Sequence, residues 1–362
     1  MAKRILFLVP YPLHESPSQR FRFEQYFDVL ETKEYRYTIQ SFLNIDNWKL
    51  FYSSGKILSK CLALLIGFSK RVIAICKSPM YDFVFIHREV TPIGPPIFEW
   101  ILVKVFGKKI IYDFDDAIWM TDRPEESAVF RTLKWRSKVS SICRWAFKIS
   151  CGNDFLCGFA MTFNNSVNYN PTTIDTTRLH NRQLFKATSP EPTKITIGWT
   201  GSHSTLKYLN EIDNVLHRIL QDFTDVEFLV IADKKPTLQY VDSVRFVPWS
   251  LETEINDLLR LDIGIMPLPD DLWSKGKCGF KALQYMALEI PAIASPVGVN
   301  SRIIDHGVNG FLCSTPEEWD YAIRKLIQDP NLRKKIGARG RKTVVENYSV
   351  NSNTSNFISL FE

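Results

Sequence analysis

The sequence predicts an α/β protein made of two Rossmann-like, doubly wound domains in series. The chain has 362 residues, and a single hydrophobic core rarely grows beyond roughly 250–300 residues. Short apolar runs alternate with helical patterns in both halves, which is typical of a parallel sheet covered by helices. A polar stretch rich in Asn, Thr and Pro, residues 163–193, interrupts this alternation. We therefore expect two domains facing a cleft, and such a cleft is a natural ligand site.

The first half contains the elements of one such domain. Buried apolar runs predict strands at 4–10, 37–42, 81–86, 109–112 and 149–151, and a short strand is expected at 167–170. Helical patterns lie between them at 21–30, 96–105 and 154–163. We assign residues 1–175 to this first domain, and we expect a hinge near residues 170–193.

The alternation restarts after the polar stretch. Strands are predicted at 194–199, 226–231, 244–247, 263–266 and 292–294. Helices are predicted at 206–220, 251–260, 280–288, 316–327 and 331–346. These elements give a second domain over residues 194–346. A last helix within residues 347–362 is expected to pack back on the first domain.

Composition and charge exclude several classes of protein. The net charge is +6, which suits an anionic nucleotide or an anionic membrane surface but also ordinary solubility. No zinc-finger spacing or other nucleic-acid motif is present, so nucleic acid is not expected as a partner. The sequence has no G-x-S-x-G elbow, no P-loop and no G-x-G-x-x-G fingerprint after its first strand, which argues against serine hydrolases, kinases and dehydrogenases.

The seven cysteines indicate a reducing compartment. Their number is odd, they are widely scattered, and no pair has C-x-x-C spacing. The apolar run at the N-terminus is too short for a signal peptide and reads as a first strand. No run of 18 apolar residues suggests a membrane span. These features predict a cytoplasmic protein.

One segment of the first domain, residues 56–78, is apolar and basic and contains no acidic residue. It fits an ordinary crossover helix. It also fits a helix that lies on an anionic membrane surface, because lysines flank its apolar centre. The sequence leaves both interpretations open, and the second predicts peripheral contact with the inner face of the cytoplasmic membrane.

The most informative stretch is 262–298, where an apolar strand, a Pro-rich loop, a helix start and a second strand follow one another. Backbone N–H groups at a helix start attract phosphate. Lys277 and Lys281 sit at this start, where the helix dipole disfavours cations, so we expect an anionic ligand there rather than a solvated helix end. Gln284, one turn further on, offers hydrogen bonds suited to ribose or sugar hydroxyls.

The second domain opens with a small-residue loop, IGWTGSHST, at residues 197–205. Gly198 and Gly201 permit close approach of a ligand to the backbone, and Ser202 lies in the same loop. Lys207 is placed to meet a phosphate in the first helical turn, which we expect to start near residues 204–205. The alternative is a tight turn between strand and helix with a solvated lysine.

The first domain carries polar residues at the ends of its strands. The run Asp113, Phe114, Asp115 and Asp116 fits a divalent metal site, an acceptor-binding surface or a simple turn. Arg88, at another strand end, is expected either to bind an anionic group or to pair with one of these aspartates. Residues 16–22 form the first loop after a strand, so Ser18 and Arg20 are candidates for the wall of the same cleft.

The C-terminal half resembles retaining glycosyltransferases of the GT-B fold and the large family-4 type. That family has E-x7-E followed by A-M-A-x-G-x-P-V-V-A-S, and the run from Gln284 to Ser295 is similar. Residues 309–312, Asn-Gly-Phe-Leu, resemble the downstream N-G-x-L element, and residues 197–207 resemble the first strand and loop of the nucleotide domain. The likeness covers residues 194–346 clearly and the first half by architecture.

The chain departs from the family pattern at several positions. The second Glu of E-x7-E falls on Gln284 and the first on Gly276, so the resemblance implies that Lys277 and Lys281 take over their polar work. This form looks like a bacterial surface-polysaccharide branch. The family's Gly-Gly loop is replaced by residues 16–19. Its histidine in the first domain falls near Asp115, which the resemblance therefore places among the catalytic residues.

The resemblance implies transfer of a sugar from a UDP- or GDP-linked donor to a glycan or lipid-linked acceptor, with retained configuration. Such enzymes need no metal, because helix N-termini and basic side chains stabilise the leaving diphosphate. The expected donor residues are Gly198, Gly201, Ser202, Lys207 and Gln284. The expected acceptor-side residues are Ser18, Arg20, Arg88, Asp113 and Asp116. A non-catalytic nucleotide-sugar-binding protein is the alternative, followed by an epimerase or phosphorylase of similar fold.

Overall fold

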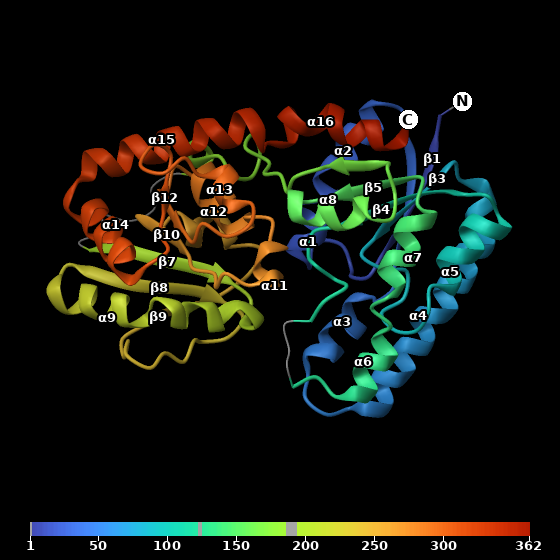
Figure 1. Ribbon diagram of the computed structural model, residues 1–362, viewed down its shortest axis with the longest axis horizontal. Coiled ribbons are helices and arrows are strands. Elements are labelled where there is room, and N and C mark those ends of the chain that lie inside the picture. Colours follow the sequence, from blue (N-terminus) through green and yellow to red (C-terminus); the bar gives the residue numbers. More distant parts are fainter. Residues whose placement is uncertain (1, 122–124, 186–193) are drawn as a thin grey trace. The chain divides into compact units, whose positions relative to one another are not determined.

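The structure, a computed structural model, describes residues 2–121, 125–185 and 194–362. Two compact units divide the chain: the first comprises Met1–Thr172 together with Thr354–Glu362, and the second comprises Thr173–Asn353. Each unit contains one six-stranded sheet with helices around it (Figure 1). The predicted α/β class with two Rossmann-like sheets is confirmed.

The sheet of the first unit is parallel throughout, in the order β2-β1-β3-β4-β5-β6. β3 is buried along its whole length, as strands covered on both faces require. Phe7, Phe23 and Phe85 pack together in its core, with ring centroids 4.9–5.5 Å apart. The strands are β1 (Arg4–Val9), β2 (Arg36–Ser41), β3 (Phe83–His87), β4 (Lys109–Phe114), β5 (Lys148–Cys151) and β6 (Val167–Tyr169).

The helices of the first unit differ from expectation in places. The predicted helix at 21–30 is broken, because Phe21, Arg22 and Phe23 are all buried and three successive residues cannot share one helix face. The predicted helix at 96–105 changes from α-helix to a π-helical turn at Ile101. The sequence analysis missed α3, α6 and α7. The helices are α1 (Pro17–Arg20), η1 (Glu24–Tyr26), α2 (Phe27–Thr32), α3 (Ile45–Tyr52), α4 (Ile57–Lys77), η2 (Ser78–Met80), α5 (Ile97–Trp100), η3 (Ile101–Val105), α6 (Ala128–Lys134), α7 (Lys138–Trp145) and α8 (Asp154–Met161).

The last residues of the chain complete the core of the first unit. They belong to α16 (Val350–Ile358) and η6 (Ser359–Phe361). The ring of Phe357 stacks on Tyr26 with centroids 4.2 Å apart, and Phe361 lies edge-on to Phe83. Phe357 and Phe361 are fully buried. The N-terminal sheet therefore depends on residues from the far end of the sequence.

The sheet of the second unit is also parallel, in the order β12-β11-β10-β7-β8-β9. Counted from β7, this is the order 3-2-1-4-5-6 of a doubly wound dinucleotide-type sheet. Its core joins strand residues such as Trp199 and Phe228 to Leu216 and Trp319 of the covering helices. The strands are β7 (Ile195–Gly201), β8 (Val226–Ala232), β9 (Arg245–Pro248), β10 (Ile263–Met266), β11 (Ala292–Ala294) and β12 (Phe311–Leu312).

The predicted helix at 206–220 is instead a 3-10 helix followed by an α-helix. The break falls at Ile212, whose φ of −129° is not helical. The predicted helix at 251–260 is also shorter than expected. The helices are η5 (His203–Glu211), α9 (Asp213–Asp222), α10 (Glu254–Leu258), α11 (Leu272–Lys275), α12 (Phe280–Ala287), α13 (Asn300–Ile303), α14 (Pro316–Gln328) and α15 (Pro330–Asn347).

The segment 173–181 was expected to be loop or linker, and it is irregular but buried. Thr173, Ile174 and His180 have no exposed surface. Arg341 of α15 donates hydrogen bonds to the carbonyls of Thr176 and His180. Residues 173–181 thus form part of the second unit. A short helical turn, η4 (Arg182–Leu184), follows, and the rest of the predicted linker, 186–193, lies outside the described residues.

No helix in the described ranges is long and apolar enough to cross a membrane. All seven cysteines are free thiols, five of them buried, whereas Cys61 and Cys76 of α4 are exposed.

Candidate functional site

Each sheet has one place where the strand order reverses, and ligands of open α/β sheets bind beyond the carboxyl ends of the strands at that place. In the second unit the reversal lies between β7 and β10. The loop after β7 contains Ser202, and the loop after β10 leads to Lys277 and α12. In the first unit the reversal lies between β1 and β3, and Tyr11 and Arg88 follow these strands. Both candidate regions from the sequence thus fall on such a place.

The structure brings two of the predicted donor motifs into contact in the second unit. A Cβ atom at Gly201 would lie 2.8 Å from Cε of Lys281 and 2.5 Å from the indole of Trp199. The Lys281 ammonium lies over that indole, 5.2 Å from the ring centroid. The lysine therefore packs across the loop after β7, and only glycine at position 201 leaves room for it. An ammonium group and a closely approachable backbone suit an anionic ligand.

Tyr285 fixes α12 beneath this loop. Its hydroxyl accepts a hydrogen bond from the backbone N–H of Thr200 (3.0 Å) and donates one to the carbonyl of Ile265 (3.4 Å). Its ring packs against Gly264 of β10. Burial raises the pKa of this phenol, so it stays protonated. One side chain thereby links β7, β10 and the helix that carries Lys281.

The start of α12 has the geometry that the sequence predicts. Gly279 precedes the helix with φ +69°, a conformation that L side chains rarely adopt. The Lys277 ammonium lies over the ring of Trp273, 4.9 Å from its centroid. Lys277 and Lys281 are both half-buried, and each is held over an indole of its own. The structure therefore places both lysines at the carboxyl edge of the sheet.

The loop after β7 differs in detail from expectation. Ser202, not residues 204–205, precedes the following helix, and its hydroxyl bonds the hydroxyl of Ser204 (2.9 Å) instead of a backbone N–H. His203 bonds Asp233 at the end of β8 through both its backbone and its ring. Lys207 is exposed, with its ammonium 5.5 Å from the ring centroid of Tyr208.

Two predicted donor residues have packing roles in the structure. Gly198 is buried, and the space where a Cβ would stand is occupied by Leu261. This packing explains the glycine without a ligand. Gln284 is only 2% exposed, and its amide lies 3.4 Å from Nε2 of His180. Gln284 is therefore in buried contact with the segment 173–181.

The candidate acceptor cluster in the first unit centres on Arg88. Its guanidinium pairs with Asp115 (2.7 Å) and Asp116 (2.8 Å), which confirms that it pairs with these aspartates. Burial alone would lower the pKa of Arg88, but the two carboxylates outweigh this and raise it. The backbone of Arg88 has φ +62°, and Tyr112 donates a hydrogen bond to its carbonyl. Such a conformation in a non-glycine residue is concentrated at functional sites.

Tyr11 is a site residue that the sequence analysis missed. Burial raises the pKa of its phenol, and Arg88, Glu89, Asp115 and Asp116 all act on it electrostatically. Its ring lies 4.6 Å from Trp48, centroid to centroid. An aromatic residue directly after the first strand was the available signal, since loops at that edge carry ligand-binding residues.

Asp113 was expected on the acceptor side, and the structure corrects this. Its carboxylate is fully buried, and it accepts hydrogen bonds from Arg22, from Ser150 (2.6 Å) and from the ring of His87 (2.8 Å). Burial raises the pKa of Asp113, but Arg22 and His87 outweigh it and hold the pKa well below its usual range. We assign this cluster to the stability of the first unit.

Ser18 and Arg20 lie on the one-turn helix α1 and not on an open loop. The hydroxyl of Ser18 bonds that of Ser16 (2.9 Å), and the guanidinium of Arg20 lies over Phe21. Gln19, fully buried between them, bonds the backbone N–H and carbonyl of Tyr11. This anchor places α1 beside Tyr11, so Ser18 and Arg20 stay acceptor-side candidates.

The metal interpretation of the aspartate run concerns Asp113, Asp115 and Asp116. Within the described ranges, no group of three or more His, Cys, Asp or Glu side chains is placed to hold a metal ion. The carboxylate of Asp113 is paired with Arg22 in its buried cluster, and those of Asp115 and Asp116 are both paired with Arg88.

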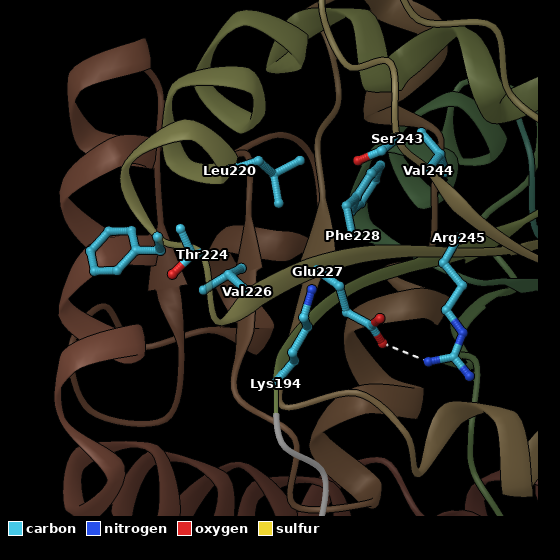
Figure 2. Close-up of a pocket in the computed structure, with 10 residues that line it drawn as sticks. Lys194, Leu220, Thr224, Val226, Glu227, Phe228, Ser243, Val244 and Arg245 are labelled. Atoms are coloured by element: carbon cyan, nitrogen blue, oxygen red, sulfur yellow. Dashed lines mark hydrogen bonds and ion pairs between the residues drawn. The ribbon is translucent and has the colours of Figure 1, made fainter.

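A cavity of about 400 Å³ opens on the second unit, away from the candidate donor residues. Figure 2 shows its lining, which includes Lys194, Glu227 and Arg245, with Glu227 and Arg245 forming an ion pair of 2.7 Å. These residues lie at the amino ends of β7, β8 and β9. Because ligands of such sheets bind at the opposite, carboxyl edge, we do not assign a donor to this cavity.

Comparison with known proteins finds similar sequences for much of the second unit. Residues 194–329 match the family model described as glycosyl transferases group 1. The chain is 25% identical over 143 residues to glycosyltransferase 1 domain-containing protein 1 of Xenopus tropicalis. It is 27% identical over 138 residues to N-acetyl-alpha-D-glucosaminyl L-malate synthase of Bacillus anthracis. The first match spans 40% of this chain and 40% of the Xenopus protein. The second spans 37% of this chain and 34% of the Bacillus protein.

Solved structures match the chain over nearly its full length. Sucrose-phosphate synthase of Thermosynechococcus elongatus superimposes with a TM-score of 0.68 at 12% identity, covering 99% of this chain and 98% of that one. Anabaena HepE in complex with UDP-glucose gives a TM-score of 0.64 at 15% identity, covering 99% of both chains. At such identities the likeness concerns the fold. The chain thus has the two-domain GT-B fold of these structures, and its residues 194–329 match the glycosyl transferases group 1 family.

Proposed function

We propose that the protein is a retaining glycosyltransferase that moves a sugar from a nucleotide-diphosphate donor to a glycan or lipid-linked acceptor. The donor is assigned to the second unit and the acceptor to the first. The observation that carries this proposal is the contact of Lys281 with Gly201 at the strand-order reversal of the second sheet. It lies inside the segment that matches the glycosyltransferase family.

The chemistry needs groups that stabilise the departing nucleotide. As the bond between the sugar C1 and the diphosphate oxygen breaks, negative charge grows on that oxygen. Donors fixed in advance near this charge lower the barrier. Lys281, Lys277 and the backbone N–H groups around Ser202 are the candidates in the second unit. Lys207, exposed on η5, is a further one.

The first unit supplies the acceptor side in this proposal. Arg88, Asp115 and Asp116 form a half-buried charged cluster beside Tyr11. Carboxylates accept hydrogen bonds from sugar hydroxyls, and Arg88 positions them. Asp115 is proposed to act at the reacting sugar, with Ser18 and Arg20 on α1 as further acceptor contacts. We place the reaction in the cytoplasm, in the assembly of a surface polysaccharide.

We expect UDP as the nucleotide of the sugar donor, with GDP as the second candidate. HepE of Anabaena, which shares the fold, was solved in complex with UDP-glucose and with UDP. The decisive assay measures nucleotide release from labelled UDP- and GDP-sugars, together with thermal stabilisation by each. Release together with stabilisation supports a transferase. Stabilisation without release indicates the alternative, a non-catalytic nucleotide-sugar-binding protein.

A double variant tests the two lysines. Lys277→Ala with Lys281→Ala should lower the turnover rate by about 100-fold or more, as loss of a transition-state hydrogen-bond donor does. The matched control is Lys334→Ala with Lys335→Ala, two exposed lysines of α15. Equal turnover in the two double variants would remove these lysines from the mechanism.

Independence of a metal is a separate prediction. If cationic side chains and backbone dipoles stabilise the leaving diphosphate, nucleotide release should be unchanged in excess EDTA. Loss of activity in EDTA, restored by Mg²⁺ or Mn²⁺, would instead assign a metal to the reaction.

NMR of the product tests whether the anomeric configuration of the sugar is retained. A retaining enzyme should give an α-linked product from an α-linked donor.

A further inference from the structure

Helix α4 of the first unit turns its bulky apolar side chains outward. Surface helices of globular proteins normally bury their apolar stripe and expose a polar one. In α4 the buried positions are mostly small, with Ala63, Gly67 and Ala74 among them. The exposed positions include Leu58, Leu62, Leu65, Val72 and Ile73, each between 50% and 87% exposed.

The exposed residues form one continuous stripe. At about 100° per residue, positions 58, 62, 65, 66, 69, 72, 73 and 76 fall within one side of the helix. This outer stripe consists of Leu58, Leu62, Leu65, Ile66, Ser69, Val72, Ile73 and Cys76, and all eight are exposed. It contains no charged residue, and the 21-residue helix that carries it is about 31 Å long.

The inner face of α4 is held firmly to the unit. Phe42 fills the space beside Gly67, where any side chain would collide with its ring. Arg71, fully buried, donates hydrogen bonds to the carbonyls of Val9 and Gln40, near the carboxyl ends of β1 and β2, and to that of Val90 in the loop after β3. The orientation of the helix is thus fixed, and the outer stripe cannot turn inward without breaking this anchor.

Charge decides which partner fits the stripe. Lys70 and Lys77 lie along one edge of the stripe, Lys56 precedes the helix as its N-cap, and no Asp or Glu occurs between residues 47 and 81. A second copy of the chain would bring these lysines against each other. An anionic bilayer accepts apolar side chains below its surface and pairs its headgroups with the flanking lysines. The neighbouring helices α3 and α5 lie on the flanks of α4 (Figure 1).

We propose that the outer stripe of α4 docks the protein on an anionic membrane surface, with the helix lying in the plane of the headgroups. The carboxyl edge of the first sheet is tied to this helix through Arg71. Docking would therefore hold the candidate acceptor cluster near the lipid surface.

Vesicle sedimentation tests the proposal with the full chain. Vesicles of phosphatidylcholine with one third phosphatidylglycerol should pellet the protein, whereas vesicles of phosphatidylcholine alone should pellet much less. Added NaCl should weaken the binding, because flanking lysines contribute by charge. A wild-type protein that stays in the supernatant with anionic vesicles overturns the proposal.

Two variants separate the apolar and the charged contributions. Leu62→Gln with Leu65→Gln should lower the vesicle affinity by about tenfold or more, because two apolar side chains that would enter the bilayer are lost. Lys56→Glu with Lys70→Glu and Lys77→Glu should remove the preference for anionic lipid. The matched control is Tyr321→Gln with Val345→Gln, two exposed apolar residues of the second unit. Equal loss in this control contradicts the proposal.

A spectroscopic readout does not depend on substituting the stripe. Cys61 and Cys76 are the exposed cysteines, so a Cys61→Ser variant labels selectively at Cys76 within the stripe. An environment-sensitive dye there should shift to the blue with anionic vesicles and be quenched by brominated lipid chains. The opposite outcome is a blue shift that appears without lipid and grows with protein concentration, together with dimers detected by light scattering. This outcome would assign the stripe to a second copy of the chain and overturn membrane docking.

Discussion

At the scale of single residues, Gly201 decides whether Lys281 can cross the loop after β7. We predict that Gly201→Ala forces Trp199 or Lys281 aside and costs about 1–3 kcal/mol of stability, as overpacking does. It should also weaken stabilisation by UDP-sugars. Thermal melting with and without nucleotide measures both effects. Gly158→Ala on α8 is the control, since nothing lies within 4 Å of its Cβ position. An unaltered melt for Gly201→Ala would disprove the close packing.

The buried carboxylate of Asp113 gives a prediction about pH. Its pKa is lowered in the folded state, so its contribution is present above the unfolded pKa of about 3.9 and is lost as pH falls towards the folded pKa. Asp113→Asn should cost about 3–5 kcal/mol at pH 7, because Arg22 loses its buried partner. The gap in melting temperature should shrink below pH 4. Asp270→Asn, on an exposed aspartate, is the control and should change little at either pH.

At the scale of elements, the hydroxyl group of Tyr285 links α12 to the strands β7 and β10. Tyr285→Phe leaves the backbone N–H of Thr200 without its acceptor in a buried place, which should cost about 1–3 kcal/mol. The loop after β7 should lose order, and nucleotide affinity should fall with it. Denaturation and isothermal titration measure the two effects. Tyr321→Phe on α14, an exposed tyrosine, should leave both unchanged. A Tyr285→Phe protein with normal affinity would show that α12 is positioned by other contacts.

The elements that the sequence predicted best are those with local causes. β10 and β11 have the predicted bounds, because each is a short buried apolar run between helix ends and prolines. The helix expected at 21–30 failed because Arg22 is drawn to Asp113, a residue distant in sequence. The contact of Gly201 with Lys281 likewise joins residues that are far apart in the sequence. Each motif was visible alone, but their contact depends on the order of strands in the sheet.

Tertiary contacts also explain the roles that the sequence misassigned. Gly198 looked like a ligand-binding glycine. In the structure the space beside it is filled by Leu261, which lies in the connection between α10 and β10. Gln284 looked available to a ribose, but His180 reaches it from a segment that read as a linker. No local pattern carries this information, since the partners are far apart along the chain.

At the scale of the whole molecule, the two units should unfold as separable transitions. Asp113→Asn should lower the transition of the first unit, and Leu261→Ala, which empties the space beside Gly198, that of the second. A UDP-sugar should raise the second transition only, since ligands stabilise the unit that binds them. Differential scanning calorimetry measures this. A rise confined to the transition lowered by Asp113→Asn would place the donor in the first unit.

The placement of residues 354–362 within the first unit has a consequence for biosynthesis. A ribosome synthesises the continuous segment 173–353 before it makes the aromatic residues that pack on Tyr26 and Phe83. Part of the interior of the nascent N-terminal sheet therefore stays uncovered until residues 354–362 have been made. A stop codon at position 354, which removes residues 354–362, should therefore destabilise the unit that was synthesised first.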